Sequence, residues 1–386
     1  EIWDTAETRQ VLHAALPDLP LRRLDAALRG QRRTFLVGSL TPEVRGRIHE
    51  LGLPGVTFEP EQKRVYPLGQ TAAHLIGFTD TGGVGLSGAE YALNDTVRAA
   101  VGQGQTVPLS IDLRVQAALE DELFREATAQ QVKGAVGLVT NVRTGEILGM
   151  ASYPAFDLNA RGSASPDALT NRAAASRYEM GSTFKVFTVA LGLDSGTATL
   201  ASTFDARTPY TIGGRTVHDY HAENKVMTVA DIFIHSSNIG TTRLAVQAGA
   251  PVVQKYFKAF GLMEASPVGL IESAKPGLPA RWDENTVAST SFGHAISVSP
   301  LALAGGMGAI LNGGNYVPLT IRPVKPGEVP KGHRAVSEET SRAMLDLMRV
   351  NVVRGTGGKA DAPGLRVGGK TGSAEKVIDG RYARTT

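Results

Sequence analysis

The chain has 386 residues, and its 40 Lys and Arg residues against 37 Asp and Glu residues give a formal net charge of +3. This length is enough for two domains with a core that folds without covalent cross-links. Cysteine is absent, which excludes disulfides, zinc–thiolate sites and cysteine nucleophiles. The charges are spread along the chain without basic runs or interleaved aromatic residues, so we expect no nucleic-acid partner.

No stretch approaches the about 20 apolar residues of a membrane span, and no secretory signal opens the chain. The sequence begins at Glu1 rather than at a methionine. We therefore expect it to be part of a longer protein, in which case the absence of an anchor here says little about the native protein.

The first part of the chain, residues 1–107, is predicted to form a smaller mixed α/β domain without a catalytic set. Thr41 followed by proline predicts the start of a helix, and Gly52 predicts its end. Strand-like runs at 34–37 and 56–58 flank this helix.

A short glycine-containing connector at 102–108 is the predicted boundary to a second domain, residues 108–386. Asp112 is suited to cap a helix whose apolar residues recur on one face. Strand-like runs at 134–140 and 146–152, with turn residues between them, predict a hairpin. A helix packed beside an antiparallel sheet indicates an α+β fold.

The stretch 178–185 leads into an apolar run whose residues fall on every side of a helix, which predicts a helix surrounded by protein. Ser182 and Lys185 are then neighbours on its first turn. Burial and the positive end of the helix dipole disfavour the charged amine, so Lys185 can take a proton and make Ser182 a nucleophile. Ser373 and Lys376 repeat the spacing in a glycine-rich segment without a helical pattern, so spacing alone does not identify a nucleophile.

A second polar cluster, at 235–240, interrupts the helical pattern after a helix that Thr228 is predicted to cap. Two interpretations stand here. In one the segment is only a loop; in the other Ser236 faces a cleft and relays a proton while the Asn238 amide holds a substrate carbonyl.

The segment 365–373 alternates in the manner of a strand, and its glycines would let another backbone approach closely. An extended peptide can pair along such an edge, with Lys370 supplying positive charge. The hydroxyls of Thr371 and Ser373, on either side of Gly372, would bind a terminal carboxylate. The alternative is a solvent-exposed edge that the lysine protects from aggregation.

Taken together and in this order, Ser182-x-x-Lys185, Ser236-x-Asn238 and Lys370-Thr371-Gly372 resemble the three motifs of penicillin-recognising serine enzymes. Stretches at 64–78, 134–152, 171–173, 291–293 and 297–300 extend the likeness, over nearly the whole chain, to the division-specific class B penicillin-binding proteins. The resemblance implies an α+β serine transpeptidase fold, an antiparallel sheet with flanking helices and a helical subdomain, after a non-catalytic pedestal.

The family's activity implies roles for the first two motifs. Ser182 would attack the penultimate D-alanine carbonyl of a peptidoglycan stem pentapeptide, and an amine from a neighbouring stem would resolve the acyl-enzyme. β-Lactams would acylate the same serine. Lys185 would be the base, Ser236 the proton relay and Asn238 a substrate clamp.

The third motif and the surroundings follow from the same resemblance. Lys370, Thr371 and Ser373, with Gly372 between them, would bind the substrate carboxylate, and the backbone N–H groups of Ser182 and Ser373 would form the oxyanion hole. No cofactor and no metal are implied. The resemblance implies a protein of the inner membrane with its catalytic domain in the periplasm, and partners among the division-complex membrane proteins, including a glycosyltransferase.

The sequence departs from the family pattern at Met180, His235 and Ala295, where proline, lysine and glycine are common. It also ends at Thr386, before the last strands and helix that the family places after the third motif. Two other functions are weighed. A serine β-lactamase is disfavoured by the long first domain and by Ser-Ser-Asn in place of Ser-Asp-Asn, and a β-lactam sensor or non-catalytic division scaffold, binding partners through residues 1–107, is disfavoured by the intact motifs.

Overall fold

The computed structural model describes residues 2, 4–30, 32–61, 63–328, 330–374, 376–378 and 381–383. The chain divides into two compact units, the first comprising Glu1–Val65 with Asp80–Gly83 and the second comprising Tyr66–Thr79 with Val84–Thr386. The first unit contains the helices α1 (Thr5–Ala15), α2 (Leu21–Arg29) and α3 (Pro42–Glu50).

The first unit is held by a small apolar cluster built around Leu12, Leu24 and Ile48, one residue from each helix. The predicted helix start is confirmed, because the Thr41 hydroxyl accepts a hydrogen bond from the Val44 N–H at 3.3 Å. The predicted strands on either side of α3 are wrong.

Among the described residues of this unit the runs 34–37 and 56–58 form no strand. Val56 and Phe58 instead pack against the helical cluster, while Phe35 is 65% exposed. A strand needs a partner strand for its backbone hydrogen bonds, and here the apolar side chains of these runs pack against helices instead. This region is therefore helical, not mixed.

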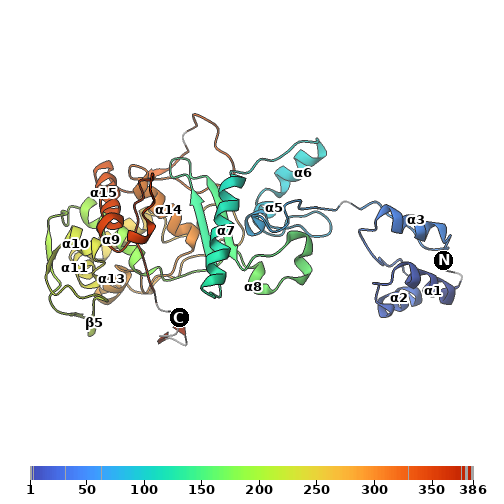
Figure 1. The fold of residues 1–386 in the computed structure, drawn as a ribbon, viewed down its shortest axis with the longest axis horizontal. Coiled ribbons are helices and arrows are strands. Elements are labelled where there is room, and N and C mark those ends of the chain that lie inside the picture. Colours follow the sequence, from blue (N-terminus) through green and yellow to red (C-terminus); the bar gives the residue numbers. More distant parts are fainter. Residues whose placement is uncertain are drawn as a thin grey trace. The chain divides into compact units, whose positions relative to one another are not determined.

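The second unit carries the remaining elements (Figure 1). Before the polar cluster at 235–240 they are α4 (Ala73–Ile76), α5 (Gly88–Ala92), α6 (Asn94–Gly102), α7 (Leu113–Ala129), β1 (Ala135–Thr140), β2 (Ile147–Tyr153), the 3₁₀ helix η1 (Leu158–Ser163), α8 (Pro166–Leu169), the 3₁₀ helix η2 (Gly181–Phe184), α9 (Lys185–Asp194), β3 (Thr203–Asp205), β4 (Tyr210–Ile212), β5 (Arg215–Val217), β6 (Val226–Thr228) and α10 (Val229–Ile234). They continue as α11 (Asn238–Ala248), α12 (Ala250–Ala259), α13 (Glu284–Thr290), α14 (Pro300–Leu311), β7 (Asn315–Tyr316), β8 (His333–Arg334), α15 (Glu338–Arg354), the 3₁₀ helix η3 (Gly358–Ala360), β9 (Lys376–Ile378) and β10 (Arg381–Ala383).

The division between the units falls earlier in the chain than the predicted boundary at 102–108. Leu75 and Leu93, which precede that connector, belong to the same buried cluster as Met150 of β2. Their burial ties the segment before the connector to the second unit. Whether residues 1–107 act together as a non-catalytic pedestal stays a prediction.

The predicted hairpin is confirmed as the antiparallel pair β1–β2, in which Gly137 lies opposite Ala151. Helix α7 packs on this pair, and Asp112 caps it by accepting a hydrogen bond from the Arg114 N–H at 2.9 Å. A Cβ atom added at Gly137 would lie 2.6 Å from a methyl carbon of Leu119. The glycine therefore lets the helix approach the strands closely.

The largest core is helical and surrounds α9, whose residues from Lys185 to Gly192 are all buried. Figure 1 shows α9, α10, α11, α13 and α15 gathered at one end of the second unit, with α7 against the strand pair. Phe184 and Phe187 contact Phe257 and Phe260 of the α12 region with ring centroids 5.2–5.6 Å apart. The apolar run after Ser182 is thus a central helix, as predicted.

The prediction of a strand at 365–373 is wrong, because this segment forms no strand in the structure. It runs along α15, where the Gly369 N–H donates to the Met348 carbonyl at 3.1 Å and Arg349 donates to the Val367 carbonyl at 2.8 Å. Helix α15 thus contacts backbone groups that we expected to be open for pairing with an extended peptide.

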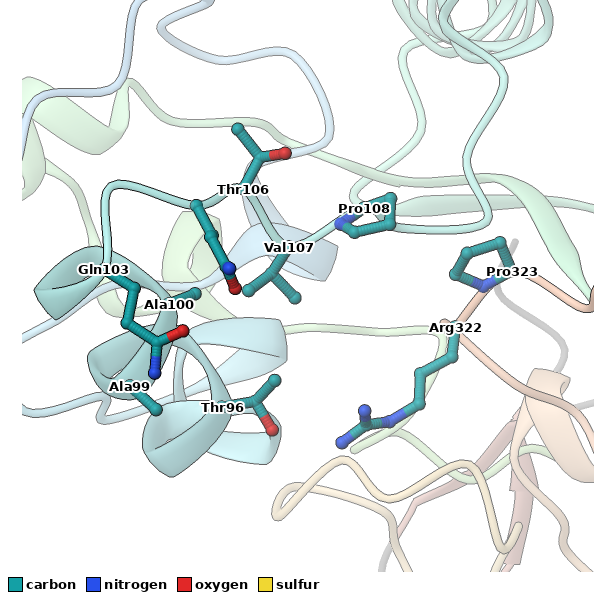
Figure 2. Close-up of a pocket in the computed structure, with 10 residues that line it drawn as sticks. Thr96, Ala99, Ala100, Gln103, Thr106, Val107, Pro108, Arg322 and Pro323 are labelled. Carbon is teal, nitrogen blue, oxygen red and sulfur yellow. The ribbon is translucent and has the colours of Figure 1, made fainter.

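An open cavity of about 430 Å³ lies beside the connector, between the end of α6 and the segment that follows β7 (Figure 2). Thr96 and Gln103 of the α6 region face Arg322 and Pro323 across its opening. None of the described motif residues lines it. Every helix in the described residues is either too short or too polar to span a lipid bilayer.

The end of α9 is fastened by one carboxylate. Asp194 accepts hydrogen bonds from the Ser337 N–H at 2.6 Å, the Thr340 hydroxyl at 3.0 Å and the Tyr256 hydroxyl at 2.7 Å. Burial acts to raise the pKa of Asp194, but these hydrogen bonds outweigh it and hold that pKa below its usual range. The charged carboxylate therefore ties α9 to α12 and α15.

We predict that Asp194→Asn lowers the free energy of unfolding by about 2 kcal/mol at pH 7, the scale of hydrogen bonds to a charged group. A depressed folded-state pKa stabilises the protein above the unfolded-state pKa, and this contribution is lost as the pH falls through the folded value. The difference between the two proteins in denaturant unfolding should therefore shrink below about pH 4. An equal difference at pH 7 and pH 3 would contradict this role.

Candidate active site

Ser182 lies on a single 3₁₀ turn, η2, which leads into α9 at Lys185. The Lys185 N–H donates to the Ser182 carbonyl, which closes this turn. We expected Ser182 on the first turn of an α-helix. A 3₁₀ turn has three residues per turn, so residues three apart, such as Ser182 and Lys185, lie almost directly above one another. Gly181 before it adopts a φ of 55°, in the region that favours glycine.

Lys185 is fully buried, and its amine contacts the second motif. Its Nζ donates to the Ser236 carbonyl at 2.5 Å, to Asn238 Oδ1 at 2.7 Å and to Ser236 Oγ at 3.1 Å. Burial, and then the nearby charge of Lys370, lower the pKa of Lys185 well below its usual value. A lowered pKa favours the neutral amine, which is the form that can accept a proton.

Ser182 and Lys185 were predicted to be neighbours, but among the described residues no hydrogen bond joins the Lys185 amine to the Ser182 hydroxyl. The amine protons are directed at Ser236 and Asn238 instead. Ser236 and Asn238 are therefore the direct partners of the buried amine.

The second motif turns the chain sharply between two helices. Ser236 has a φ of 57°, a left-handed conformation that is costly for a residue with a side chain. Ser237 then caps α11 by accepting from the Gly240 N–H at 3.0 Å. The segment is an ordered turn that joins α10 to α11, and the cleft interpretation stays a prediction.

Lys370 completes the arrangement from the third motif. Its Nζ donates to Ser236 Oγ at 2.9 Å and to the Thr371 carbonyl at 3.0 Å. Burial lowers the pKa of Lys370 to about 8. The Ser236 hydroxyl oxygen therefore accepts from two lysines, and the three motifs meet at this atom.

The remaining third-motif residues lie directly against the Ser182 turn through their main chain. A Cβ atom added at Gly181 would lie 2.1 Å from the Ser373 carbonyl oxygen. A Cβ atom added at Gly372 would lie 2.7 Å from the Met180 carbonyl oxygen. The eight predicted residues thus come from segments that gather at one place. Lys185, Ser236, Asn238 and Lys370 are joined by side-chain hydrogen bonds, and Lys370 also donates to the Thr371 carbonyl. Gly372 and Ser373 approach the turn that carries Ser182 through their main chain.

Sequence reasoning missed Asp219, which follows β5. Its carboxylate accepts from the Ser237 hydroxyl at 2.7 Å and from the Ile239 N–H at 2.9 Å, while the preceding His218 carbonyl accepts from Asn238 Nδ2 at 2.9 Å. Asp219 also acts to raise the pKa of Lys185. It lies in a polar loop, where no periodicity or motif distinguishes it from its charged neighbours.

Two of the departures from the family pattern have local partners. His235 Nδ1 lies 3.3 Å from Glu223 Oε1. Ala295 has a φ of 58°, which explains a preference for glycine there, and its N–H donates to Glu179 Oε1 at 2.9 Å. Neither departure removes a group from the cluster around Ser236. Within the described residues no group of three or more His, Asp or Glu side chains is placed to hold a metal ion.

Residues 135–386 match the family described as the penicillin binding protein transpeptidase domain. The chain belongs to this family. It is 60% identical over 380 residues to the probable peptidoglycan D,D-transpeptidase FtsI of Caulobacter vibrioides, covering 97% of this chain and 64% of that protein. It is 31% identical over 394 residues to the peptidoglycan D,D-transpeptidase FtsI of Escherichia coli K12, covering 95% of this chain and 66% of that protein.

Solved structures agree with the predicted fold. Penicillin-binding protein 3 from Mycobacterium tuberculosis, complexed with ampicillin, is 28% identical and covers 83% of this chain and 77% of that chain, with a TM-score of 0.76. The transpeptidase domain of Burkholderia pseudomallei penicillin-binding protein 3 is 30% identical, and the match covers 72% of this chain and 80% of that chain, with a TM-score of 0.65. The resemblance inferred from the motifs and the transpeptidase fold are thereby confirmed.

We predict that Asp219→Asn slows acylation by a fluorescent penicillin about tenfold, because an amide cannot accept both hydrogen bonds that position the second motif. Loss of the charge also removes an influence that raises the pKa of Lys185. The acid limb of the rate's pH profile, which reports Lys185 deprotonation, should therefore shift to lower pH. Asp205→Asn, which affects a surface pair with Arg207, is the matched control. A slower acylation rate whose pH profile does not shift would contradict the proposed effect of Asp219 on the pKa of Lys185.

Proposed function

We propose that this chain is the catalytic part of a division-specific peptidoglycan D,D-transpeptidase that β-lactams acylate. The observation that carries the proposal is the Ser236 hydroxyl, which lies within hydrogen-bonding distance of the Nζ atoms of two lysines of lowered pKa, 3.1 Å from that of Lys185 and 2.9 Å from that of Lys370. The match to the transpeptidase family and the names of the relatives support it.

Acylation begins with proton transfer away from Ser182. A neutral Lys185 has two protons, which suit its two shortest contacts, the Ser236 carbonyl and Asn238 Oδ1. Its lone pair then faces Ser236 Oγ at 3.1 Å. In the proposed step Ser236 gives its proton to Lys185 and takes the proton of Ser182, whose oxygen attacks the substrate carbonyl and forms the ester bond.

The developing oxyanion is proposed to be held by the backbone N–H groups of Ser182 and Ser373. Support comes from the close approach of the Ser373 main chain to Gly181. Lys370 and the Thr371 and Ser373 hydroxyls are proposed to bind the carboxylate of the terminal D-alanine. The expelled D-alanine nitrogen takes a proton returning through Ser236, and an acceptor amine from another stem peptide then attacks the ester.

The chain spans 64% of the length of the Caulobacter relative, so the setting of the whole protein is part of the proposal. We propose an inner-membrane protein with its catalytic part in the periplasm. Its partners are the stem pentapeptide, the acceptor amine and membrane proteins of the division complex, including a glycosyltransferase.

We predict that a fluorescent penicillin labels this protein at Ser182 and that Ser182→Ala abolishes the label. Ser373→Ala is the comparison, because Ser373 also precedes a lysine by three residues; Ser182 should still be labelled, but more slowly, because the ligand carboxylate loses one hydroxyl partner. Peptide mapping of the adduct provides the measurement. Label on Ser373, or undiminished label on the Ser182→Ala protein, would overturn the assignment.

A serine β-lactamase is the alternative within the same family of folds, and it needs a group that activates water. Both oxygens of Asp219, which contacts the second motif, accept hydrogen bonds from Ser237 and Ile239. A carboxylate held in this way is a positioning group, not a general base. This favours the transpeptidase.

We predict that the penicilloyl ester on Ser182 persists for many minutes, because the tethered leaving group obstructs the face that an acceptor amine would use. With a D-alanyl thioester the leaving group departs, so added D-alanine should divert the acyl group to aminolysis. Mass spectrometry of ester decay and product partitioning measure both. Decay within seconds would favour a β-lactamase, and a stable ester without thioester turnover would favour a sensor or scaffold.

A further inference from the structure

The Thr371 hydroxyl, a proposed carboxylate ligand, already donates a hydrogen bond within the protein. Its proton is directed at Thr356 Oγ1, at 2.9 Å. The Thr356 hydroxyl in turn donates to Asn351 Oδ1 at 3.3 Å, and the Thr356 N–H donates to the same oxygen at 3.2 Å. The three residues form a directed chain of hydrogen bonds that leads away from the site.

The inner end of this chain of hydrogen bonds, at Asn351, is held in place. Asn351, near the end of α15, is fully buried, and its Nδ2 donates to the Gly369 carbonyl at 2.9 Å. This contact assigns the orientation of the amide, so Oδ1 must face Thr356. A Cβ atom added at Gly355 would lie 2.4 Å from Asn351 Oδ1, so a glycine is needed there to let the turn close over the amide.

The outer end of this chain of hydrogen bonds, formed by the hydroxyls of Thr356 and Thr371, can rearrange. Thr356 and Thr371 are both exposed, and a hydroxyl has one proton to donate and two positions at which to accept. In the arrangement seen here the Thr371 proton points at Thr356, so its oxygen would present lone pairs to an anion. A carboxylate ligand therefore requires the Thr371 proton to turn.

Rotation of the Thr356 hydroxyl makes this possible at little cost. If Thr356 donates to Thr371 instead of to Asn351, Thr371 is free to donate to the carboxylate. Asn351 Oδ1 still accepts from the Thr356 N–H, so no buried acceptor loses its last partner. Successive hydroxyl donors also polarise one another, which strengthens the outermost hydrogen bond.

We propose that Thr356 is a positioning residue that sets carboxylate specificity through Thr371, its hydroxyl switching from Asn351 to Thr371 when a carboxylate binds. This inference rests on the proposed function, because it assigns the substrate carboxylate to the third motif. It adds a residue outside the three motifs that decides how strongly a charged terminus is preferred over a neutral one.

The test compares two D-alanyl thioesters, one whose leaving group ends in a carboxylate and one whose leaving group ends in a carboxamide. Thr356→Val should lower kcat/KM for the carboxylate substrate about tenfold, mainly through KM, the scale of a hydrogen bond to a charged group. The carboxamide substrate should change by no more than about twofold. Thr356→Ser, which keeps the hydroxyl, should restore the preference.

A double-mutant cycle separates the relay from a structural effect. In a Thr371→Val background, Thr356→Val should have no further effect on the preference for carboxylate. Thr199→Val is the matched control, since Thr199 is also an exposed threonine paired with a hydroxyl, that of Ser202, beyond the far end of α9. It should leave both substrates unchanged.

An equal loss with both substrates, no loss, a gain, or additive effects of Thr356→Val and Thr371→Val would each overturn the relay. These outcomes are distinct from failure of the proposed function. That failure would appear in the unmodified protein, as absent penicillin label on Ser182 or absent thioester turnover, before any Thr356 variant is compared.

Discussion

The arrangement depends on one buried amine. Lys185 is fully buried in the helical core, where a charged group is costly unless its donors are satisfied. Its three acceptors come from Ser236, between α10 and α11, and from Asn238, the first residue of α11. The need to satisfy this amine explains why Ser236 is held in a left-handed conformation and why a second lysine can approach the same hydroxyl. The reactive properties and the local fold thus have a common origin.

A second layer of residues maintains this geometry. Asp219 holds the start of α11, and Asn351 holds the turn after α15 beside the third motif. Each lies in a different element from the motif it supports. The motif side chains can therefore lie on short, irregular segments, because hydrogen bonds from these supporting residues hold the segments in place.

The sequence predicted those parts whose signals are local. The cap of α3, the β1–β2 pair and the central helix after Ser182 follow from capping residues and apolar spacing. The strand expected at 365–373 did not form, because its partner is the end of α15, a contact that no local pattern encodes. Asp219 was missed for the same reason, since its importance comes from hydrogen bonds to residues 18 and 20 positions away.

The contact between Gly181 and Ser373 has a consequence for how such a site can vary. The two main chains approach so closely that a single additional carbon atom at Gly181 would overlap the Ser373 carbonyl. The spacing between the Ser182 turn and the third-motif segment therefore requires the absence of a side chain at Gly181. Substitutions elsewhere on the rim of the site can alter which molecules enter without changing this spacing, so ligand selectivity can evolve while the alignment of the reacting groups is preserved.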